Sequence, residues 1–411
     1  MIKRLTKDKL VNFHFFSICF LGASILLPEN LRNISLFLFV ILIVILALKK
    51  PKYSATLIKP LVANTSLFLI LSLSLLYSSD LDLGLKRLMV IASMPVFSIG
   101  FYLINSTYTI NYDNFLKKFY LIFYISTALF FVCVLIQNIF NDHLNEFIFR
   151  DYSERINSKY GKYSMHPIYA SLYISISLLI ATQISHYFKS IVKRILFYSS
   201  ILFLVLILVM LARKGIIAIT TLLFAVYFLR KKNKKVIYTY VSILIVFLAF
   251  SYFIEPIRNR YMEFINAFFN SENGTLGSTS YRLNIYKCAL AKIYDNPIFG
   301  CGIGDTKGVL LSCYQEKSNI FNGLYFNSHN QFLSAWLSSG ILGVLALGYM
   351  IVYNFKLAIK RRNFIYFSII IIFLSALMTE NILERQNGAL LFSFFINLLA
   401  FKSLQEAPQE E

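Results

Sequence analysis

The chain has 411 residues, of which 57% are hydrophobic and only 15% are charged. This composition argues against a soluble enzyme, in which about a quarter of the residues are charged, and the 40 Phe and 27 Tyr residues exclude a disordered chain. The net charge is +20, which we attribute to basic loops on the cytoplasmic side of a membrane protein and not to nucleic-acid binding.

Apolar runs of the length of a membrane span recur along the whole sequence. A transmembrane helix needs ~20 mostly apolar residues, with a range of ~17–25. Twelve runs approach that length, at about residues 10–27, 34–48, 61–77, 88–105, 119–140, 167–185, 195–211, 214–229, 236–254, 331–355, 364–379 and 388–403. We therefore predict an all-α polytopic membrane protein with about twelve transmembrane helices. Residues 1–254 would carry helices 1–9, residues 331–403 helices 10–12, and residues 404–411 a cytoplasmic tail.

The distribution of Lys and Arg predicts which way the helices face. If the N-terminus is cytoplasmic, most basic residues outside segment 255–330 fall on the cytoplasmic side, as the positive-inside rule requires, and both termini share that side. Arg213 and Lys214 depart from the rule. They lie in a short break of the apolar run 195–229. Both flanks of this run are basic and should be cytoplasmic, so the run must cross the membrane twice and the break between the two crossings is expected to face outward. Such misplaced charges indicate a functional site, although both side chains could also simply reach the outer headgroups.

Residues 255–330 form the large extramembrane segment, between the ninth and tenth helices, and we expect it in the periplasm as a loop domain. A short amphipathic helix is predicted at 281–294. Arg282 and Tyr286 share one face of this helix. We expect the helix to lie along the outer membrane surface, with Arg282 pointing at the site.

The five cysteines show no pattern typical of a metal site. Cys288, Cys301 and Cys313 could share the outer compartment. Because three is an odd number, we assign no disulfide.

Two histidines are expected on the outer face. His329 lies in segment 327–331, at the first turn of the tenth helix, where the helix dipole disfavours a charged imidazole and so favours a neutral general base. The alternative is a histidine that only bonds a neighbouring loop carbonyl. His166, before the sixth helix, is the weaker second candidate.

Two further outer segments carry polar residues. Glu380, Glu384 and Arg385 lie in the predicted outer loop 379–387, and the i, i+4 spacing of the two glutamates would put both carboxylates on one helical face. They could position arginines, or they could belong to a solvated loop without a function. The Gly-rich segment 300–305, which ends at Asp305, could offer N–H groups to a phosphate, but its pattern favours a tight turn. No motif indicates a metal or any other cofactor.

Arg213, Arg282, His329 and Arg385 all fall on the predicted outer face. Arginine matches phosphate oxygens bidentately and stays charged, and its charge stabilises a diphosphate as the bond to it breaks. A base beside the arginines would remove the proton of an acceptor hydroxyl. The set indicates metal-independent group transfer from a lipid-linked diphosphate donor outside the cytoplasm.

Several segments resemble the O-antigen ligase / O-antigen polymerase family. They are YRLNIYKCAL (281–290), NPIFGCGIGD (296–305) and HNQFLSAWLSSGILGVLAL (329–347). The turn at 211–215 is similar to the Ser-Arg-Gly turn of that family, with Ala212 and Lys214 departing from it and Arg213 retained. The resemblance covers roughly residues 205–400.

The resemblance implies an inverting, metal-independent, GT-C-like glycosyltransferase in the bacterial inner membrane, with its active site facing the periplasm. The donor would be an undecaprenyl-diphosphate-linked glycan and the acceptor lipid A-core or another glycan. His329 would be the base, and Arg213 and Arg282 would hold the donor diphosphate. Supporting positions would be Lys214, Asn330, Asp305, Glu380, Arg385 and His166.

Four interpretations stay open at this point. The first is an O-antigen ligase that transfers the glycan to lipid A-core. The second is an O-antigen or capsule polymerase that extends a lipid-linked glycan, and the third is an oligosaccharyltransferase acting on protein. The fourth is a twelve-helix transporter, which would need charged or broken helices at the midplane.

Overall fold

The computed structural model describes residues 7–24, 26, 29–49, 51–108, 111–140, 165–211, 214–230, 258, 278–316 and 325–405, and all regular elements within them are helical. The α-helices are α1 (Lys7–Ser24), α2 (Glu29–Ala47), α3 (Ala55–Ser74), α4 (Leu81–Ile91), α5 (Ser93–Thr107), α6 (Tyr112–Phe140), α8 (Pro167–Ile184), α9 (Ile191–Met210), α10 (Lys214–Arg230), α13 (Ser278–Asp295), α14 (Thr306–Glu316), α16 (Gln331–Lys360), α17 (Phe364–Thr379) and α18 (Gln386–Gln405). Short 3₁₀ turns are η2 (Leu75–Tyr77), η4 (Ser185–Tyr187) and η5 (Ile382–Glu384).

The number and length of the apolar helices identify a multi-pass membrane protein. Within the described residues, seven segments are long and apolar enough to cross a bilayer, and four shorter apolar helices accompany them. Each of these coincides with one of the predicted spans. The remaining predicted span, 236–254, lies outside the described residues, as does most of 255–277.

One predicted span is built differently from the expectation. The run predicted at 88–105 is two consecutive helices, α4 and α5, which meet at Ala92. Pro95 explains the break, because a proline has no N–H to donate and its ring clashes with the carbonyl four residues earlier, at Ile91.

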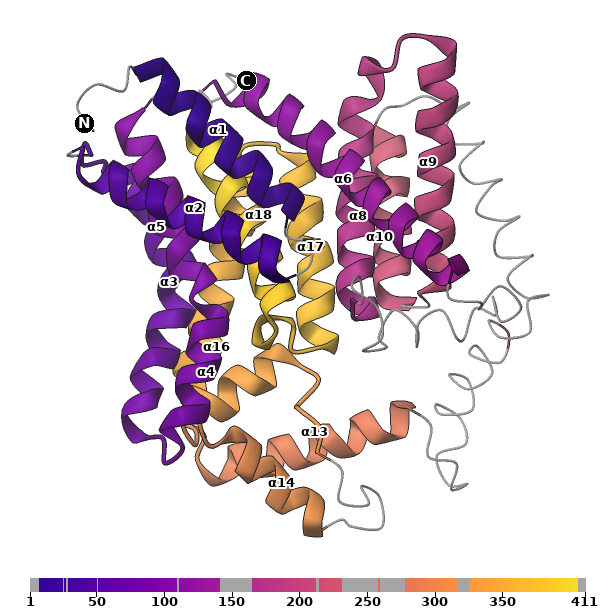
Figure 1. Cartoon of the computed structure of the whole chain (residues 1–411). Coiled ribbons are helices and arrows are strands. Elements are labelled where there is room, and N and C mark those ends of the chain that lie inside the picture. Colours follow the sequence, from indigo (N-terminus) through magenta and orange to yellow (C-terminus); the bar gives the residue numbers. More distant parts are fainter. Residues whose placement is uncertain are drawn as a thin grey trace.

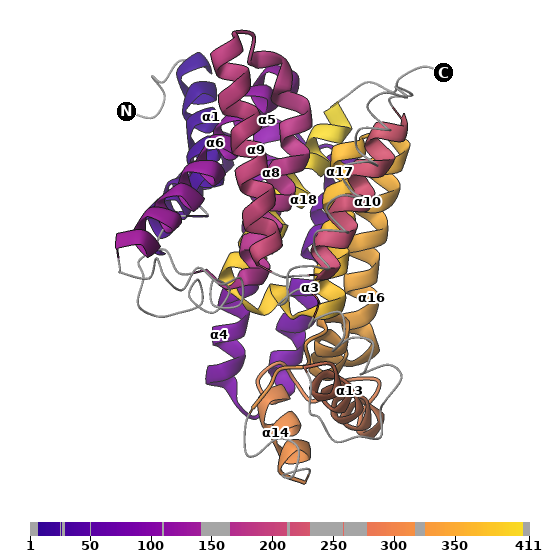
Figure 2. The same cartoon turned by 90° about the vertical axis from the view of Figure 1, so that its right-hand side faces the viewer.

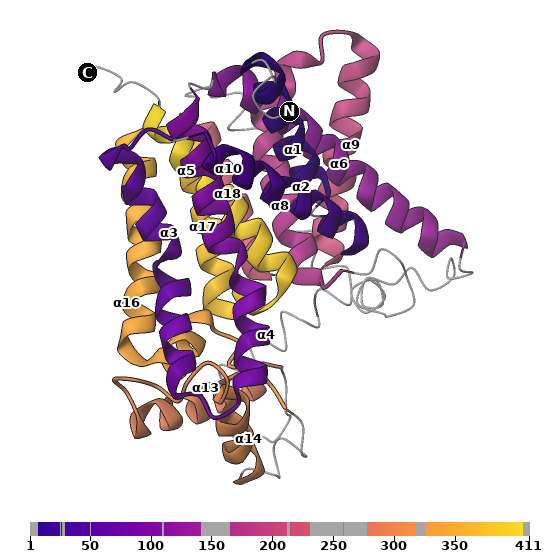
Figure 3. The same cartoon turned by 60° about the vertical axis from the view of Figure 1, so that its left-hand side comes forward.

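The helices gather into a bundle with a distinct unit at one end (Figure 1). Helix α16 packs along α3, and α18 packs against α5, α3 and η5; Figure 3 shows α3 and α4 in front of this group. Helices α8, α9 and α10 stand beside it. Helices α13 and α14 lie across the end opposite to the one where α1 begins and α18 ends (Figures 1 and 2). Helix α9 ends and α10 begins toward the α13–α14 end, in agreement with the two crossings predicted for the run 195–229.

The interior of the bundle is apolar with one amide network at its centre. Asn64 donates to Asn397 at 2.8 Å, and Asn354 donates to Asn64 at 2.7 Å. Ser98 and Tyr366 complete the network through Asn397 and Asn354. All three asparagines are at most 2% exposed, so their mutual bonds satisfy groups that would otherwise be costly inside a bilayer.

Helix α16 is broken near the α13–α14 end, and a loop fills the break. The backbone leaves helical geometry at Ser339 and at Gly340, whose φ is +63°. There, Cys301 N–H donates to the Leu337 carbonyl at 2.7 Å, and Ile341 N–H donates to the Pro297 carbonyl at 3.0 Å. The Gly-rich segment thus replaces the helical hydrogen bonds that the break removes.

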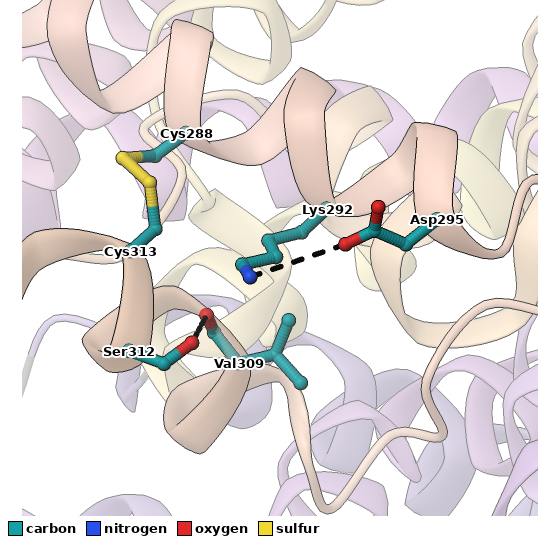
Figure 4. Close-up of a disulfide and its surroundings, with 6 residues drawn as sticks. All are labelled: Cys288, Lys292, Asp295, Val309, Ser312 and Cys313. Atoms are coloured by element: carbon teal, nitrogen blue, oxygen red, sulfur yellow. Dashed lines mark hydrogen bonds and ion pairs between the residues drawn. A yellow bond between two sulfur atoms is a disulfide. The ribbon is translucent and has the colours of Figure 1, made fainter. Parts of the chain in front are cut away.

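A disulfide joins the two helices of the end unit. Cys288 of α13 bonds Cys313 of α14, with their Cα atoms 5.8 Å apart (Figure 4). Cys301 stays free, so the three cysteines of this region form one pair and leave one thiol over. The odd number of cysteines explains why the sequence alone allows no assignment. Ile285, Ala289, Ile293 and Tyr314 surround the bond in a small core separate from that of the bundle.

Candidate functional site

His329 lies immediately before α16 and not on its first turn. Asn330 is the N-cap of this helix, and its Oδ1 accepts from the N–H groups of Phe332 and Leu333. His329 itself has a φ of +44°, in the left-handed region. Its N–H donates to Asn327 Oδ1 at 3.2 Å and its carbonyl accepts from the Tyr286 hydroxyl at 3.2 Å. The sequence placed the residue on the first turn of the helix, whereas the structure places it before the capping residue, outside the helix.

The imidazole of His329 is held by a carboxylate from another helix. Glu380 is the C-cap residue of α17, with extended backbone, and its Oε2 lies 2.8 Å from His329 Nδ1. A carboxylate oxygen accepts, so Nδ1 carries the proton in this pair, which leaves Nε2 as the nitrogen that could accept a proton. No hydrogen bond to Nε2 comes from the described residues, and a histidine whose other nitrogen is fixed by a carboxylate has the arrangement of a general base.

Arg282 completes a chain of three charged or titratable groups. Its Nη2 lies 2.9 Å from Glu380 Oε1, so one carboxylate bridges the guanidinium and the imidazole. The side chain of Arg282 stays 35% exposed and that of His329 25%, against 13% for Glu380. The bridging carboxylate is therefore the covered member, while the guanidinium and the imidazole stay accessible to a ligand.

The two loop glutamates do not share a helical face. The backbone is extended at Glu380 itself, and Glu384 ends the short turn η5, so the i, i+4 argument fails for lack of a continuous helix. Glu384 Oε1 accepts from Asn381 Nδ2 at 2.7 Å and from the hydroxyl of Ser334 on α16. Asn381 also bonds Ser328, the residue before His329. Glu384 thus fastens the loop to α16, while Glu380 faces the imidazole.

The Gly-rich segment is a packing turn and not a phosphate cradle. Gly302 N–H donates to the Ser338 carbonyl, and Gly304 N–H donates to Ser78 Oγ. The carboxylate of Asp305 accepts from the backbone N–H groups of Ser79 and Asp80. Asp305 therefore holds the turn before α4, and the structure gives it no contact with His329. Burial, together with the Asp305 carboxylate, raises the pKa of the Cys301 thiol in this turn to about 11.

The other predicted site residues take different positions. Asn330 caps α16 and also donates to the Met378 carbonyl of α17. His166 is the N-cap of α8, where its Nδ1 accepts from Ile168 N–H at 3.4 Å. Arg385 is exposed between η5 and α18. Lys214 begins α10, and Arg213 lies outside the described residues. The structure therefore brings together His329, Arg282 and Glu380 from the predicted set.

Tyr286 and Asn327 are the site residues that the sequence did not reveal. Tyr286 was placed on the same helical face as Arg282, but nothing in the sequence indicated that its hydroxyl reaches the His329 backbone. Asn327 was part of the segment around His329. A usable signal was its place two residues before the histidine, because Asn side chains commonly bond the backbone two residues on.

Comparison with known proteins finds a family match over the part of the chain that carries Arg282 and His329. Residues 198–348 match the family model described as O-Antigen ligase, which confirms the resemblance over that range. A protein of Haemophilus influenzae, described as uncharacterized, is 30% identical over 162 residues. That match covers 37% of this chain and 40% of the relative, so it spans less than half of the relative's length. The matched domain contains Arg282 and His329, and Glu380 follows it in the chain.

Proposed function

We propose that this chain, whose residues 198–348 form a domain of the O-antigen ligase family, transfers a glycan from undecaprenyl diphosphate to lipid A-core. The observation that carries the proposal is the chain of contacts from Arg282 through Glu380 to His329, at the end of a transmembrane bundle. An accessible base beside an accessible guanidinium suits the removal of a hydroxyl proton next to a diphosphate leaving group.

The transfer step follows from the roles of these groups. The acceptor hydroxyl attacks the anomeric carbon of the donor sugar while His329 Nε2 takes its proton. The bond between that carbon and the diphosphate oxygen breaks, and the diphosphate leaves with the electron pair. Attack opposite to the leaving group inverts the anomeric configuration. Glu380 keeps the proton on Nδ1 and stabilises the imidazolium that forms.

The guanidinium groups would take up the charge of the leaving group. Arg282 uses Nη2 on Glu380 and keeps more than a third of its side chain exposed, so a further edge can meet phosphate oxygens. We propose Arg213 as the second diphosphate ligand, because α9, which precedes it, ends and α10, which follows it, begins at the same end of the bundle as α13. Lys214 and Arg385 would contribute more general attraction for the anionic donor.

The site is proposed to face the periplasm of a bacterial inner membrane. The α13–α14 end lies opposite the end where α1 begins and α18 ends. The Cys288–Cys313 bond supports this orientation, because disulfides persist in oxidising compartments and are rare in the cytosol. The distribution of basic loops favours the same direction.

The test combines a strain phenotype with one substitution. In a deletion strain, lipopolysaccharide gels should show lipid A-core without attached glycan, and lipid-linked polymer should accumulate. The wild-type gene should restore the glycan, and His329→Ala should not, although the variant accumulates in the membrane. A deletion strain whose core carries one repeat unit would instead identify a polymerase, and full complementation by His329→Ala would remove the base assignment.

A further inference from the structure

Helix α13 reaches His329 by two separate routes. Arg282 acts on the imidazole through Glu380, whereas Tyr286, one turn later on the same face, donates its hydroxyl to the His329 carbonyl at 3.2 Å. The first route fixes the ring and the second fixes the backbone. Since both begin on α13, the position of this helix sets the position of the histidine.

The backbone of His329 needs external support. A φ of +44° is sparsely populated for a residue with a Cβ, and such conformations persist when surrounding contacts hold them. Asn327 supports the N–H side and Tyr286 the carbonyl side. Burial raises the pKa of the Tyr286 hydroxyl above its ordinary value, so this group stays protonated and able to donate at neutral pH.

Helix α13 is in turn fixed by the disulfide. Cys288 follows Tyr286 by two residues, and its bond to Cys313 joins α13 to α14 (Figure 4). The first residue of α14, Thr306, accepts from the guanidinium of Arg87 on α4. A continuous set of contacts therefore runs from the transmembrane bundle through α14 and the disulfide to α13.

We propose that Tyr286 and the Cys288–Cys313 disulfide are positioning groups that hold His329 for catalysis, an inference that rests on the proposed function of His329 as the base. The hydroxyl holds the left-handed backbone, and the disulfide holds the helix that carries the hydroxyl. Loss of either group lets the histidine move without removing a substrate contact. The effect should therefore appear in kcat and not in the KM of the donor.

The kinetic test uses the full-length enzyme and variants that remove one group each. Tyr286→Phe deletes only the hydroxyl and should lower kcat about tenfold, the effect of one hydrogen bond lost where the reaction depends on it, with KM of the lipid-linked donor within about twofold. Cys288→Ser should act in the same way. The kcat of the double variant should lie within about twofold of the kcat of the slower single variant, because both substitutions act on the position of His329. Matched controls are Tyr294→Phe, on the exposed side of α13, and Cys133→Ser, a free exposed cysteine; both should keep wild-type kcat.

A second measurement does not depend on activity. Hydrogen–deuterium exchange of the detergent-solubilised protein should become at least about tenfold faster in peptide 325–333 for Tyr286→Phe and Cys288→Ser, while peptide 386–405 stays unchanged. Unchanged kcat or unchanged exchange at 325–333 would overturn the inference, as would a raised KM at constant kcat. If His329→Ala abolishes transfer while Tyr286→Phe changes neither readout, the positioning role fails and the proposed function stands. If the wild-type enzyme shows no transfer while peptide 325–333 loosens as expected, the proposed function fails and the holding of His329 stands.

Discussion

Replacing Glu380 with glutamine tests the central contact of the site. The substitution keeps the shape and removes the charge, so both bonds of the carboxylate are affected: 2.8 Å to His329 Nδ1 and 2.9 Å to Arg282 Nη2. If the new amide nitrogen faces His329, Nδ1 must accept and the proton moves to Nε2, the nitrogen needed as base. If it faces Arg282, the amide N–H and the guanidinium N–H are both donors, so the bond to Arg282 is lost.

The magnitude follows from the strength of such bonds. Hydrogen bonds to charged groups contribute ~1.5–3 kcal/mol each. We take about 3 kcal/mol as the loss for Glu380→Gln, since the two bonds share one carboxylate and are not additive. At ~1.4 kcal/mol per factor of ten, kcat should fall by about a hundredfold or more.

The assay is single-substrate kinetics with purified enzyme, lipid-linked glycan donor and excess lipid A-core. Glu384→Gln is the matched control, because this carboxylate lies in the same loop but bonds Asn381 and Ser334. It should lower kcat by no more than a few fold, and both variants should elute as folded protein. A Glu380→Gln enzyme with kcat within threefold of wild type (a criterion of about 0.6 kcal/mol) would refute the assignment of Glu380 as the group that holds the base.

The remaining predictions concern the diphosphate contact, the break in α16 and the free thiol. Arg282→Lys should raise the KM of the lipid-linked donor about tenfold, because lysine cannot bind bidentately; an unchanged KM would argue against a diphosphate ligand. Gly340→Ala should reduce the amount of folded protein in the membrane, since φ is +63° and a Cβ would overlap the Ile298 carbonyl. Gly348→Ala, with open space around the glycine, should leave that amount unchanged. Cys301 should react slowly with iodoacetamide at pH 8 and faster as the pH rises toward its pKa of about 11, where the thiolate forms; fast labelling at pH 8, read by mass spectrometry, would contradict its burial.

The sequence predicts the membrane architecture because apolar runs report it directly. Hydropathy located α3, α8 and α18, and charge parity divided the run 195–229 into α9 and α10. Helix α13 was also predictable, since its apolar face repeats at helical spacing and is buried at Ala289 and Ile293. The ninth predicted span, 236–254, and the GT-C-like arrangement stay predictions.

The connections within the site were less predictable because they join distant parts of the chain. Glu380 pairs with Arg282 across 98 positions and with His329 across 51. Spacing rules describe neighbours on one element, and they failed for Glu380 and Glu384 because the chain leaves helical geometry at Glu380, where α17 ends. The disulfide was missed for a similar reason: a count of cysteines carries no distances, whereas α13 and α14 pack as neighbours.

The interior of the bundle argues for a scaffold and against a transport pathway. A transporter needs half-helices whose freed backbone groups meet a substrate near the midplane. Helix α16 is broken, but the backbone of Pro297 and Cys301 occupies the break and bonds its exposed groups. The polar network that joins α3, α16 and α18 consists of amides and hydroxyls bonded to one another, with Asn64, Asn354 and Asn397 at its centre. The proposed base, His329, and the guanidinium of Arg282 lie instead at one end, where α13, α16 and α17 meet, as expected of a bundle that holds a reaction site at its surface.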